Sequence, residues 1–419
     1  MLVDFRGKIL TAPWIWLDGQ FRQNVHLKID DKGKIVQIME GHHEAEKQCD
    51  DGMAAVYCRL DNTALLPGFV NAHSHAFHRC LRGRSQIAGI TTVGEFHYVH
   101  HADDEKFGLD LAVVEAALEV GIRLVLIETL YMRSGFNADG LEPDQWRFGT
   151  KSVEDFCQNV HNLMDKIEHS DTVSLALAVH SLRAVPVSAA RQITQFAVDH
   201  HLPLHIHLEE QPAELEQCVL TDSQGREPSQ LLLQEILPPS PRPLDFLTVV
   251  HCTYTQRHSM DEFAARGAHI CVCPCTEGFL GDGVPKLAAG DRLCVGTDCN
   301  NRIAILEELR WLVFSKFVFE MVHNCRNWAA IDATKMVEIA TKNGASALGL
   351  AESVGEFRVG KSMDCLAIDC RSDQLEQFVV VSESDQQQQL ADAIVFGAGN
   401  AQIACTVVAG KVLYRNKCV

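Results

Sequence analysis

The 419-residue sequence lacks the marks of several classes of protein. It has no run of about 18 apolar residues, so we expect neither a membrane-spanning segment nor a membrane partner. Lysine and arginine form no cluster, and the formal net charge of −18 argues against a nucleic acid as partner. The start, MLVDFRGKILTAPWIWLDG, has no basic segment followed by a long apolar one, so we expect no secretory signal and predict a cytoplasmic location.

Paired cysteines are also lacking, because the 16 cysteines include no CxxC pair of the kind that holds structural zinc. Several lie inside apolar segments, among them Cys271, Cys273, Cys294 and Cys365. In a long chain without a secretory signal they indicate reduced thiols rather than a disulfide framework. The composition, 47% hydrophobic and 22% charged, is that of an ordinary globular protein.

Both ends of the chain carry short strand patterns. Near the amino end, an Asp-Lys-Gly turn separates two alternating apolar runs and predicts a hairpin. A similar pattern of short apolar runs returns in the last part of the chain. We therefore predict that residues 1–66 and 352–419 together form one small β-sandwich domain.

The long middle of the chain alternates between apolar strand segments and segments with helical periodicity. Helical segments include 109–121, 154–169 and 188–201. The strand segments are 65–75, 89–99, 123–131, 173–182, 202–210, 247–254, 268–277 and 292–299. Eight strands alternating with helices predict an α/β fold, a metal-dependent (β/α)8 barrel of the TIM type over residues 67–351.

Polar residues interrupt the strand segments at their carboxyl ends, where the chemistry of such barrels lies. In HSH, His73 and His75 point the same way because side chains alternate along a strand. Solvated loop histidines are the alternative for one such pair, but the pattern recurs at other strands and favours a metal site. The further polar residues at strand ends are Glu95, His97, Tyr98, His180, Arg183, His205, His207, Glu209, Glu210, His251 and Asp298.

Three imidazoles and one carboxylate suit zinc and leave one position open for water. The predicted ligands are His73, His75, His207 and Asp298. His205 shares a strand face with His207 and competes for the role; we favour His207 because Glu210 follows it at a spacing that reaches the reacting atoms. Asp298 is alternatively the cap of the helix that follows, but its Gly-Thr-Asp turn closes the last strand, where a carboxylate can face the ion.

A metal of this kind lowers the pKa of its water toward 7 and makes hydroxide available to attack an electrophilic carbon. We predict that Glu210 is the general acid and base and that Asp298 helps to take the first proton. His251 is predicted to steady the water or the developing charge. A solvated charge at a helix start is the alternative for Glu210, because three further glutamates lie nearby in the sequence.

These residues lie in motifs that resemble a known family. PGFVNAHSHAF at 67–77 and Thr-Asp at 297–298 resemble the zinc deaminase branch of the amidohydrolase superfamily. Further motifs resemble, within it, the formimidoylglutamate deiminases, and the similarity covers nearly the whole chain. These motifs are GEFHYVHH (94–101), VHSLRAV (179–185), HIHLEEQ (205–211), TEGFLGDG (276–283) and EELRWL (307–312).

The resemblance implies attack of water on the formimidoyl carbon of N-formimidoyl-L-glutamate, which yields N-formyl-L-glutamate and ammonia in histidine degradation. It implies a homodimer and one zinc ion per chain, with iron as the alternative, because the fourth strand lacks the lysine that bridges two metals in other members. Glu210 and His251 match the catalytic pair. Tyr98, His180 and Arg183 match substrate-binding positions.

The guanidinium of Arg183 offers a bidentate site for one substrate carboxylate, and an ordinary surface arginine is the alternative. Two positions depart from the family pattern. His78 stands where the family has a substrate-contacting glutamine, and Cys299 and Asn300 stand where it has serine and histidine. These departures leave a related amidine, a guanidine or an aminated heterocycle open as the small-molecule substrate.

The segment 76–88 between the first two barrel strands is too short for the loop and helix that the family carries there. Its shortness predicts that the first barrel helix is missing and that the outer faces of these two strands are exposed. A catalytically impaired paralogue or splice form that retains metal binding is therefore a third interpretation.

Overall fold

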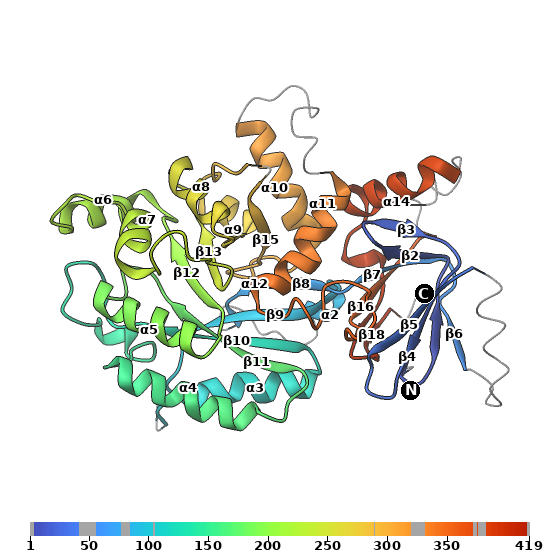
Figure 1. Cartoon of the computed structure of the whole chain (residues 1–419), viewed down its shortest axis with the longest axis horizontal. Helices are drawn as coiled ribbons and strands as arrows, with labels where there is room; N and C mark the ends of the chain where they lie inside the picture. Colours follow the sequence, from blue (N-terminus) through green and yellow to red (C-terminus); the bar gives the residue numbers. More distant parts are fainter. Residues whose placement is uncertain are drawn as a thin grey trace.

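Eight parallel strands form the centre of the molecule in the computed structural model, which describes residues 4–41, 56–76, 84–103, 105–288, 290–319, 332–371, 375 and 383–416. Their order in the sheet follows their order in the chain, and helices surround them (Figure 1), which confirms the predicted (β/α)8 barrel. The strands are β8 (Phe69–Ser74), β9 (Ile90–His97), β10 (Arg123–Leu130), β11 (Val173–Val179), β12 (Leu204–Leu208), β13 (Leu247–His251), β14 (His269–Val272) and β15 (Arg292–Val295).

The turn after β15 joins the last strand to the first and completes the barrel. A parallel bridge pairs Ser74 with Asp298. The Asn71 side chain donates to the Thr297 hydroxyl at 2.7 Å and accepts from the Thr297 amide at 3.0 Å. A side chain at Gly296 would approach β8 to 2.6 Å, so glycine is required where the strands come this close. The turn that carries Asp298 is thereby fixed to β8.

The helices predicted at 109–121, 154–169 and 188–201 are present as α3 (Gly108–Val120), α4 (Val153–Ile167) and α5 (Val187–Asp199). The Ser152 hydroxyl caps α4 by accepting from the Asp155 amide at 3.1 Å. The other described helices and helical turns are α2 (Arg84–Ile87), η3 (Pro143–Gln145), α6 (Pro212–Thr221), α7 (Pro228–Leu231), η4 (Leu232–Ile236), α8 (Arg257–Ala265), α9 (Pro274–Leu280), α10 (Ile305–Phe319), α11 (Ala333–Glu338), η6 (Ile339–Asn343), α12 (Gly344–Ala347), α14 (Glu383–Gly397) and η7 (Asn400–Gln402).

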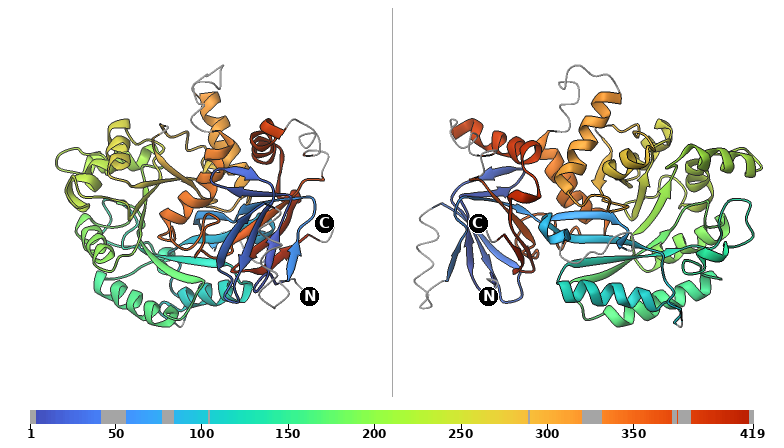
Figure 2. Two further views of the ribbon diagram at one scale, coloured as in Figure 1. Left: turned by 45° about the vertical axis from the view of Figure 1, so that its right-hand side comes forward. Right: turned by 180° about the vertical axis from the view of Figure 1, so that it is seen from behind.

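Two further sheets, built from both ends of the chain, lie beside the barrel (Figures 1 and 2). Their strand orders are β5-β4-β1-β6 and β18-β17-β16-β7-β2-β3. Apolar side chains of both sheets share one core, to which Leu27, Leu65 and Val407 belong. The strands are β1 (Ile9–Thr11), β2 (Trp14–Leu17), β3 (Gln20–Arg22), β4 (Val25–Ile29), β5 (Ile35–Glu40), β6 (Tyr57–Arg59), β7 (Thr63–Pro67), β16 (Cys365–Asp369), β17 (Ile403–Val408) and β18 (Lys411–Arg415).

The predicted hairpin is present between β4 and β5, with Gly33 at a φ of 81° in its turn. The carboxyl-terminal part is less rich in strands than expected, because α14 occupies residues between β16 and β17. The domain limits 1–66, 67–351 and 352–419 stay predictions.

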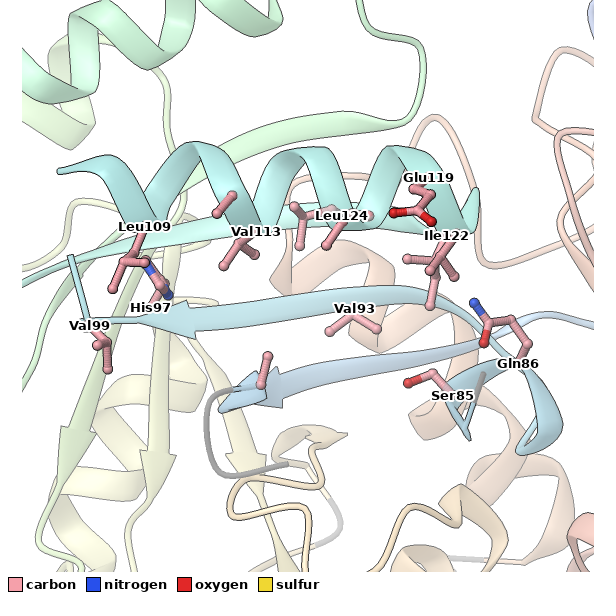
Figure 3. A pocket seen from close by; sticks show the side chains of 15 residues that line it. Ser85, Gln86, Val93, His97, Val99, Leu109, Val113, Glu119, Ile122 and Leu124 are labelled. Carbon is pink, nitrogen blue, oxygen red and sulfur yellow. The ribbon is translucent and has the colours of Figure 1, made fainter. Parts of the chain in front are cut away.

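The connection from β8 to β9 holds only the four-residue helix α2 among its described residues. The expectation that the two strands would be exposed is nevertheless wrong, since every residue of β8 and β9 is buried. Strands β16 and β17 of the adjoining six-stranded sheet contact β9. On the outer side of β9, next to α3, lies a largely apolar pocket of about 360 Å³ (Figure 3).

Two smaller expectations concern membranes and thiols. Within the described ranges, the structure contains no helix with the length and apolar character needed to cross a bilayer. The described cysteines carry free thiols, as expected for reduced side chains.

Candidate active site

Four side chains from three strand ends converge inside the carboxyl end of the barrel. His73 and His75 come from the end of β8, His207 from β12 and Asp298 from the turn after β15. The Nε2 atoms of His73 and His75 lie 3.4 and 3.0 Å from Asp298 Oδ1, and those of His73 and His207 lie 3.1 Å apart. All four side chains are at most 6% exposed. The structure thus brings together the four residues predicted as metal ligands.

The donor set fits a zinc-type cation. His75 Nδ1 lies 2.9 Å from the carbonyl oxygen of Phe96, so Nδ1 carries the hydrogen and the Nε2 lone pair is left facing the cluster. Burial opposes a charge on Asp298, but the adjacent His73 and His75 imidazoles hold its pKa well below its usual value. The Phe96 ring stacks on His207 at 4.3 Å and fixes that imidazole.

His205 does not belong to this cluster. Its Nε2 lies 3.2 Å from the carbonyl oxygen of Ala347, which also accepts from the Thr248 hydroxyl at 3.3 Å. Ala347 belongs to α12, which packs against β8 and β15, so His205 packs below the site. The preference for His207 over His205 thus agrees with the geometry.

Left-handed backbone is concentrated where β12, β13 and β15 end. The residues with positive φ there are Glu209 (52°), His251 (71°), Cys252 (54°), Asp298 (43°) and Asn300 (53°). Such conformations cost about 1–3 kcal/mol each for residues other than glycine and occur mainly at functional sites. The surrounding hydrogen bonds maintain them: the Asp298 amide, for example, donates to the His73 carbonyl at 3.0 Å. Backbone of this kind therefore gathers at the end of the barrel that carries the histidine–carboxylate cluster.

Glu210 and His251 lie side by side at the edge of the cluster. Glu210 Oε1 is 3.9 Å from His251 Nε2. The other ring nitrogen, Nδ1, donates to Glu277 Oε1 at 3.3 Å, and Glu277 Oε1 also accepts from the Cys273 amide at 2.9 Å. Burial opposes a charge on His251, but Glu277 and the nearby carboxylates raise its pKa to about 10. Nε2 of His251 therefore faces Glu210, the other member of the predicted catalytic pair.

The predicted substrate-binding residues lie on the neighbouring strands. The ring centroids of Tyr98 and His180 are 5.0 Å apart, and Tyr98 lies 5.3 Å from His75. Burial and the nearby Arg183 guanidinium hold the pKa of His180 well below its usual value, so that His180 is neutral. Tyr131 packs on His180 at 4.5 Å. The same end of the barrel therefore offers a cation, a neutral imidazole and two phenols.

The remaining predicted positions fall elsewhere. His78 lies outside the described residues. Asn300 is fully buried and donates from Nδ2 to the Ser74 hydroxyl and the His75 carbonyl, each at 3.0 Å. Asn300 therefore ties the Asp298 turn to β8.

Sequence reasoning missed two residues of this site. Glu277 lies in the quoted motif TEGFLGDG but received no role, because only the fold shows that it reaches His251. Tyr131 follows β10 directly, and in the sequence it looks like an ordinary tyrosine at a strand end. His97 was counted among strand-end residues that could face the site, yet it points to the outer side of β9 and lines the pocket there (Figure 3).

The sequence matches the signature of the amidohydrolase family over residues 64–413. It is 30% identical over 408 residues to formimidoylglutamate deiminase of Pseudomonas aeruginosa, an alignment that covers 84% of this chain and 85% of that enzyme. It is 28% identical to 5-methylthioadenosine/S-adenosylhomocysteine deaminase of Teredinibacter turnerae, over 74% of this chain and 72% of that one. The predicted resemblance to formimidoylglutamate deiminases is confirmed.

Solved structures show the same fold. An amidohydrolase from Brucella melitensis superposes with a TM-score of 0.79 at 24% identity, covering 97% of this chain and 94% of that one. A zinc-bound adenosine deaminase from Xanthomonas campestris superposes with a TM-score of 0.76 at 19% identity, covering 97% and 92%. At these identities the likeness concerns the fold.

Proposed function

The chain belongs to the amidohydrolase family, and on that premise we propose that it removes ammonia from N-formimidoyl-L-glutamate by hydrolysis and yields N-formyl-L-glutamate. Its family and its deaminase relatives make it a metal-dependent hydrolase of carbon–nitrogen bonds. The choice of substrate rests on one observation, the 30% identity to a formimidoylglutamate deiminase over most of both chains. The cytoplasmic location, the homodimer and the place in histidine degradation stay predictions that follow from the resemblance.

The metal centre in this proposal consists of His73, His75, His207 and Asp298, and it holds one catalytic ion, zinc or alternatively iron. Their donor atoms all lie within 4.8 Å of one another. A zinc ion held there would supply Lewis-acid activation of water for attack on the substrate.

In the reaction, the oxygen of water bonds to the formimidoyl carbon, and the bond from that carbon to the terminal nitrogen breaks. We assign the protons to Glu210: its carboxyl group passes them from water to the leaving nitrogen, which departs as ammonia. Asp298 helps to take the first proton from water. His251 donates from Nε2 toward the developing negative charge, and its Nδ1–H stays on Glu277.

The rest of the substrate carries two carboxylates, which need cationic or hydrogen-bonding partners. Arg183 supplies a guanidinium that can bind one carboxylate through two parallel hydrogen bonds. Burial raises the pKa of Tyr98 far above its usual value, so its hydroxyl stays a donor. The neutral His180 offers a further donor or acceptor. These groups orient the amidine carbon over the metal centre.

Ammonia release from formimidoylglutamate, measured on the purified full-length chain loaded with zinc, tests the proposal. Glu210→Gln should lower kcat by about 10²-fold or more, because the amide cannot carry the proton. Glu216→Gln is the matched control, since Glu216 lies exposed on α6, the helix that follows Glu210. Equal turnover by the wild type and Glu210→Gln would contradict the assigned role.

A substrate panel separates the alternatives. Other amidines and guanidines test relaxed recognition, and 5-methylthioadenosine tests an aminated heterocycle, as the similarity to the Teredinibacter enzyme suggests. If kcat/KM for one of these compounds is at least tenfold higher than for formimidoylglutamate, that compound takes the place of the proposed substrate. Zinc binding without turnover of any of them identifies a catalytically impaired chain.

A further inference from the structure

A second buried group of histidine and carboxylate side chains lies on the outer side of β9. His97 ends β9 and His100 follows it, Asp110 comes from α3, and Glu128 comes from β10. Phe96 points into the barrel, so the alternation of the strand directs His97 to the opposite side. His97 is 3% exposed and the other three are fully buried.

The donor atoms of His97, His100 and Asp110 all lie within 4.8 Å of one another, as the ligands of one ion do, and Glu128 lies beside His100. His97 Nε2 and His100 Nδ1 lie 3.1 and 2.9 Å from Asp110 Oδ1, and His100 Nδ1 lies 3.4 Å from Glu128 Oε2. Ligand bonds of about 2.0–2.1 Å in a tetrahedral zinc site place neighbouring donor atoms about 3.3–3.4 Å apart. The corresponding separations at the candidate active site are 3.0 to 3.4 Å.

The carboxyl group of Glu128 has no hydrogen-bond partner among the described residues. Both of its oxygens are buried, and the nearer one faces the other donors of the group. Leaving such a group unpaired costs about 1–3 kcal/mol, and more when it is charged. A cation between Glu128 and Asp110 would remove this cost, and a proton on Glu128 directed at His100 Nδ1 is the alternative.

The orientation of His100 also requires a positive charge between it and the two carboxylates. Its Nε2 lies 2.9 Å from the carbonyl oxygen of Thr129, which can only accept, so Nε2 carries the hydrogen. In a neutral ring, Nδ1 then directs its lone pair at the oxygens of Asp110 and Glu128. That contact is repulsive unless a cation or a second proton lies there. A backbone carbonyl that fixes the tautomer in this way is a common feature of histidines that bind metal.

We propose that His97, His100 and Asp110, with Glu128 beside them, form a second metal site, distinct from the catalytic centre, for a divalent transition cation such as zinc. Two carboxylates and two neutral imidazoles carry a formal charge of −2, which one divalent ion balances. Nitrogen and carboxylate donors suit zinc and its neighbours in the first transition row. This proposal is independent of the substrate and of the proposed function.

The surroundings supply support for the ligands and a route to them. The Asn159 side chain of α4 donates to Asp110 Oδ2 at 2.8 Å and leaves Oδ1 directed at the two histidines. The pocket of about 360 Å³ between β9 and α3 reaches His97 at one end, beside Val99 and Leu109 (Figure 3). A cation held there would connect β9, β10 and α3 and would fix the start of the loop that presents Tyr98 to the candidate active site.

Zinc stoichiometry tests this site on the full-length chain. The metal-free protein is loaded with zinc, exchanged into metal-free buffer and measured by elemental analysis. Glu128→Gln keeps the shape of the side chain but loses its charge, and it should bind one zinc ion fewer per chain than the wild type. The matched control is Glu115→Gln, at an exposed position of α3, which should bind as many ions as the wild type.

Equal zinc content in the wild type and Glu128→Gln overturns the proposal, because protons rather than a metal ion would then balance the charge of the two carboxyl groups. A second measurement uses the wild type alone and does not depend on the folding of a variant. Titration of the metal-free chain with zinc against a coloured chelator should show two bound equivalents, and the midpoint of thermal unfolding should rise again with the second. A single equivalent overturns the proposal, whether or not formimidoylglutamate is hydrolysed.

Discussion

The two buried histidine–carboxylate clusters differ in their neighbours more than in their own composition. Inside the barrel, the cluster around Asp298 lies beside Glu210 and His251, the pair predicted to move protons. On the outer side of β9, the cluster around Asp110 is enclosed by α3, β10 and α4. A metal-binding donor set therefore does not by itself identify a reactive site. The groups that surround it decide between chemistry and support.

Removing the carboxylate of the inner cluster should have the largest effect. We expect Asp298→Ala to lower kcat for ammonia release by about 10³-fold or more, because it removes a predicted metal ligand that also takes a proton. A loss of several kcal/mol of transition-state stabilisation corresponds to that factor. Steady-state kinetics with zinc in excess measure it.

The same change in the outer cluster serves as the comparison. Asp110→Asn should lower kcat by less than about tenfold, because no reacting group lies beside it, although it should lower the midpoint of thermal unfolding. Losses of similar size in the two variants would contradict the division between a reactive and a supporting cluster.

The next largest effect is expected at Arg183. Arg183→Met should raise KM for formimidoylglutamate so that kcat/KM falls by about 10²-fold, since a charge-assisted pair contributes about 1.5–3 kcal/mol. Formamidine, which has no carboxylate, is the matched substrate, and its low turnover should be unaffected by the substitution. Equal losses on both substrates would show that Arg183 acts on the metal centre or on its neighbours.

The inner cluster could be predicted from the sequence because side chains alternate along a strand. The spacing in HSH places His73 and His75 on one side of β8, and the Gly-Thr-Asp turn places Asp298 opposite them. Both inferences use local geometry alone, and the distances of 3.4 and 3.0 Å to Asp298 agree with them. The barrel itself was predictable because its strands and helices alternate at regular spacing.

The outer cluster was not predictable from local patterns. His97 was grouped with the other polar residues at strand ends because the sequence does not show which face of β9 points into the barrel. The structure shows it, since Phe96 stacks on His207 inside the barrel. Asp110 is an acidic residue in the first turn of α3, where a carboxylate is ordinary. Glu128 stands within an apolar strand, and only the packing of α3 on β10 brings these residues together. Tertiary contacts of this kind have no signature in one sequence.

A smaller effect is expected at Glu277, which positions His251 from behind. Glu277→Gln should lower kcat by about tenfold and leave KM nearly unchanged, because it loosens a carboxylate–histidine pair without contacting substrate. Glu277→Asp, which keeps the charge on a shorter side chain, should restore part of the rate. A change confined to KM would argue that Glu277 contacts the substrate instead.

The smallest effect on turnover is expected at Glu214. This residue also tests the argument that the buried carboxyl group of Glu128 requires a cation. Both are buried carboxyl groups with an oxygen that lacks a partner among the described residues. Burial raises the pKa of Glu214 to about 7; Arg183 opposes the shift, and Glu209 and Glu210 add to it. Burial raises the pKa of Glu128 in the same direction, but Glu128 faces His100 in the outer cluster, whereas Glu214 is flanked by other carboxyl groups.

The pH dependence of unfolding distinguishes a buried carboxyl group that keeps a proton from one that binds a cation. Between pH of about 4.5 and 7 the folded chain keeps the Glu214 proton that the unfolded chain releases, so the free energy of unfolding falls as pH rises, by up to about 3 kcal/mol. Glu214→Gln removes this contribution and should make the protein more stable than the wild type at pH 8 but not at pH 4. Denaturant unfolding at both pH values, with zinc present, measures it. Under the same conditions Glu128→Gln should destabilise the protein at pH 8, because it removes a ligand rather than an unwanted charge.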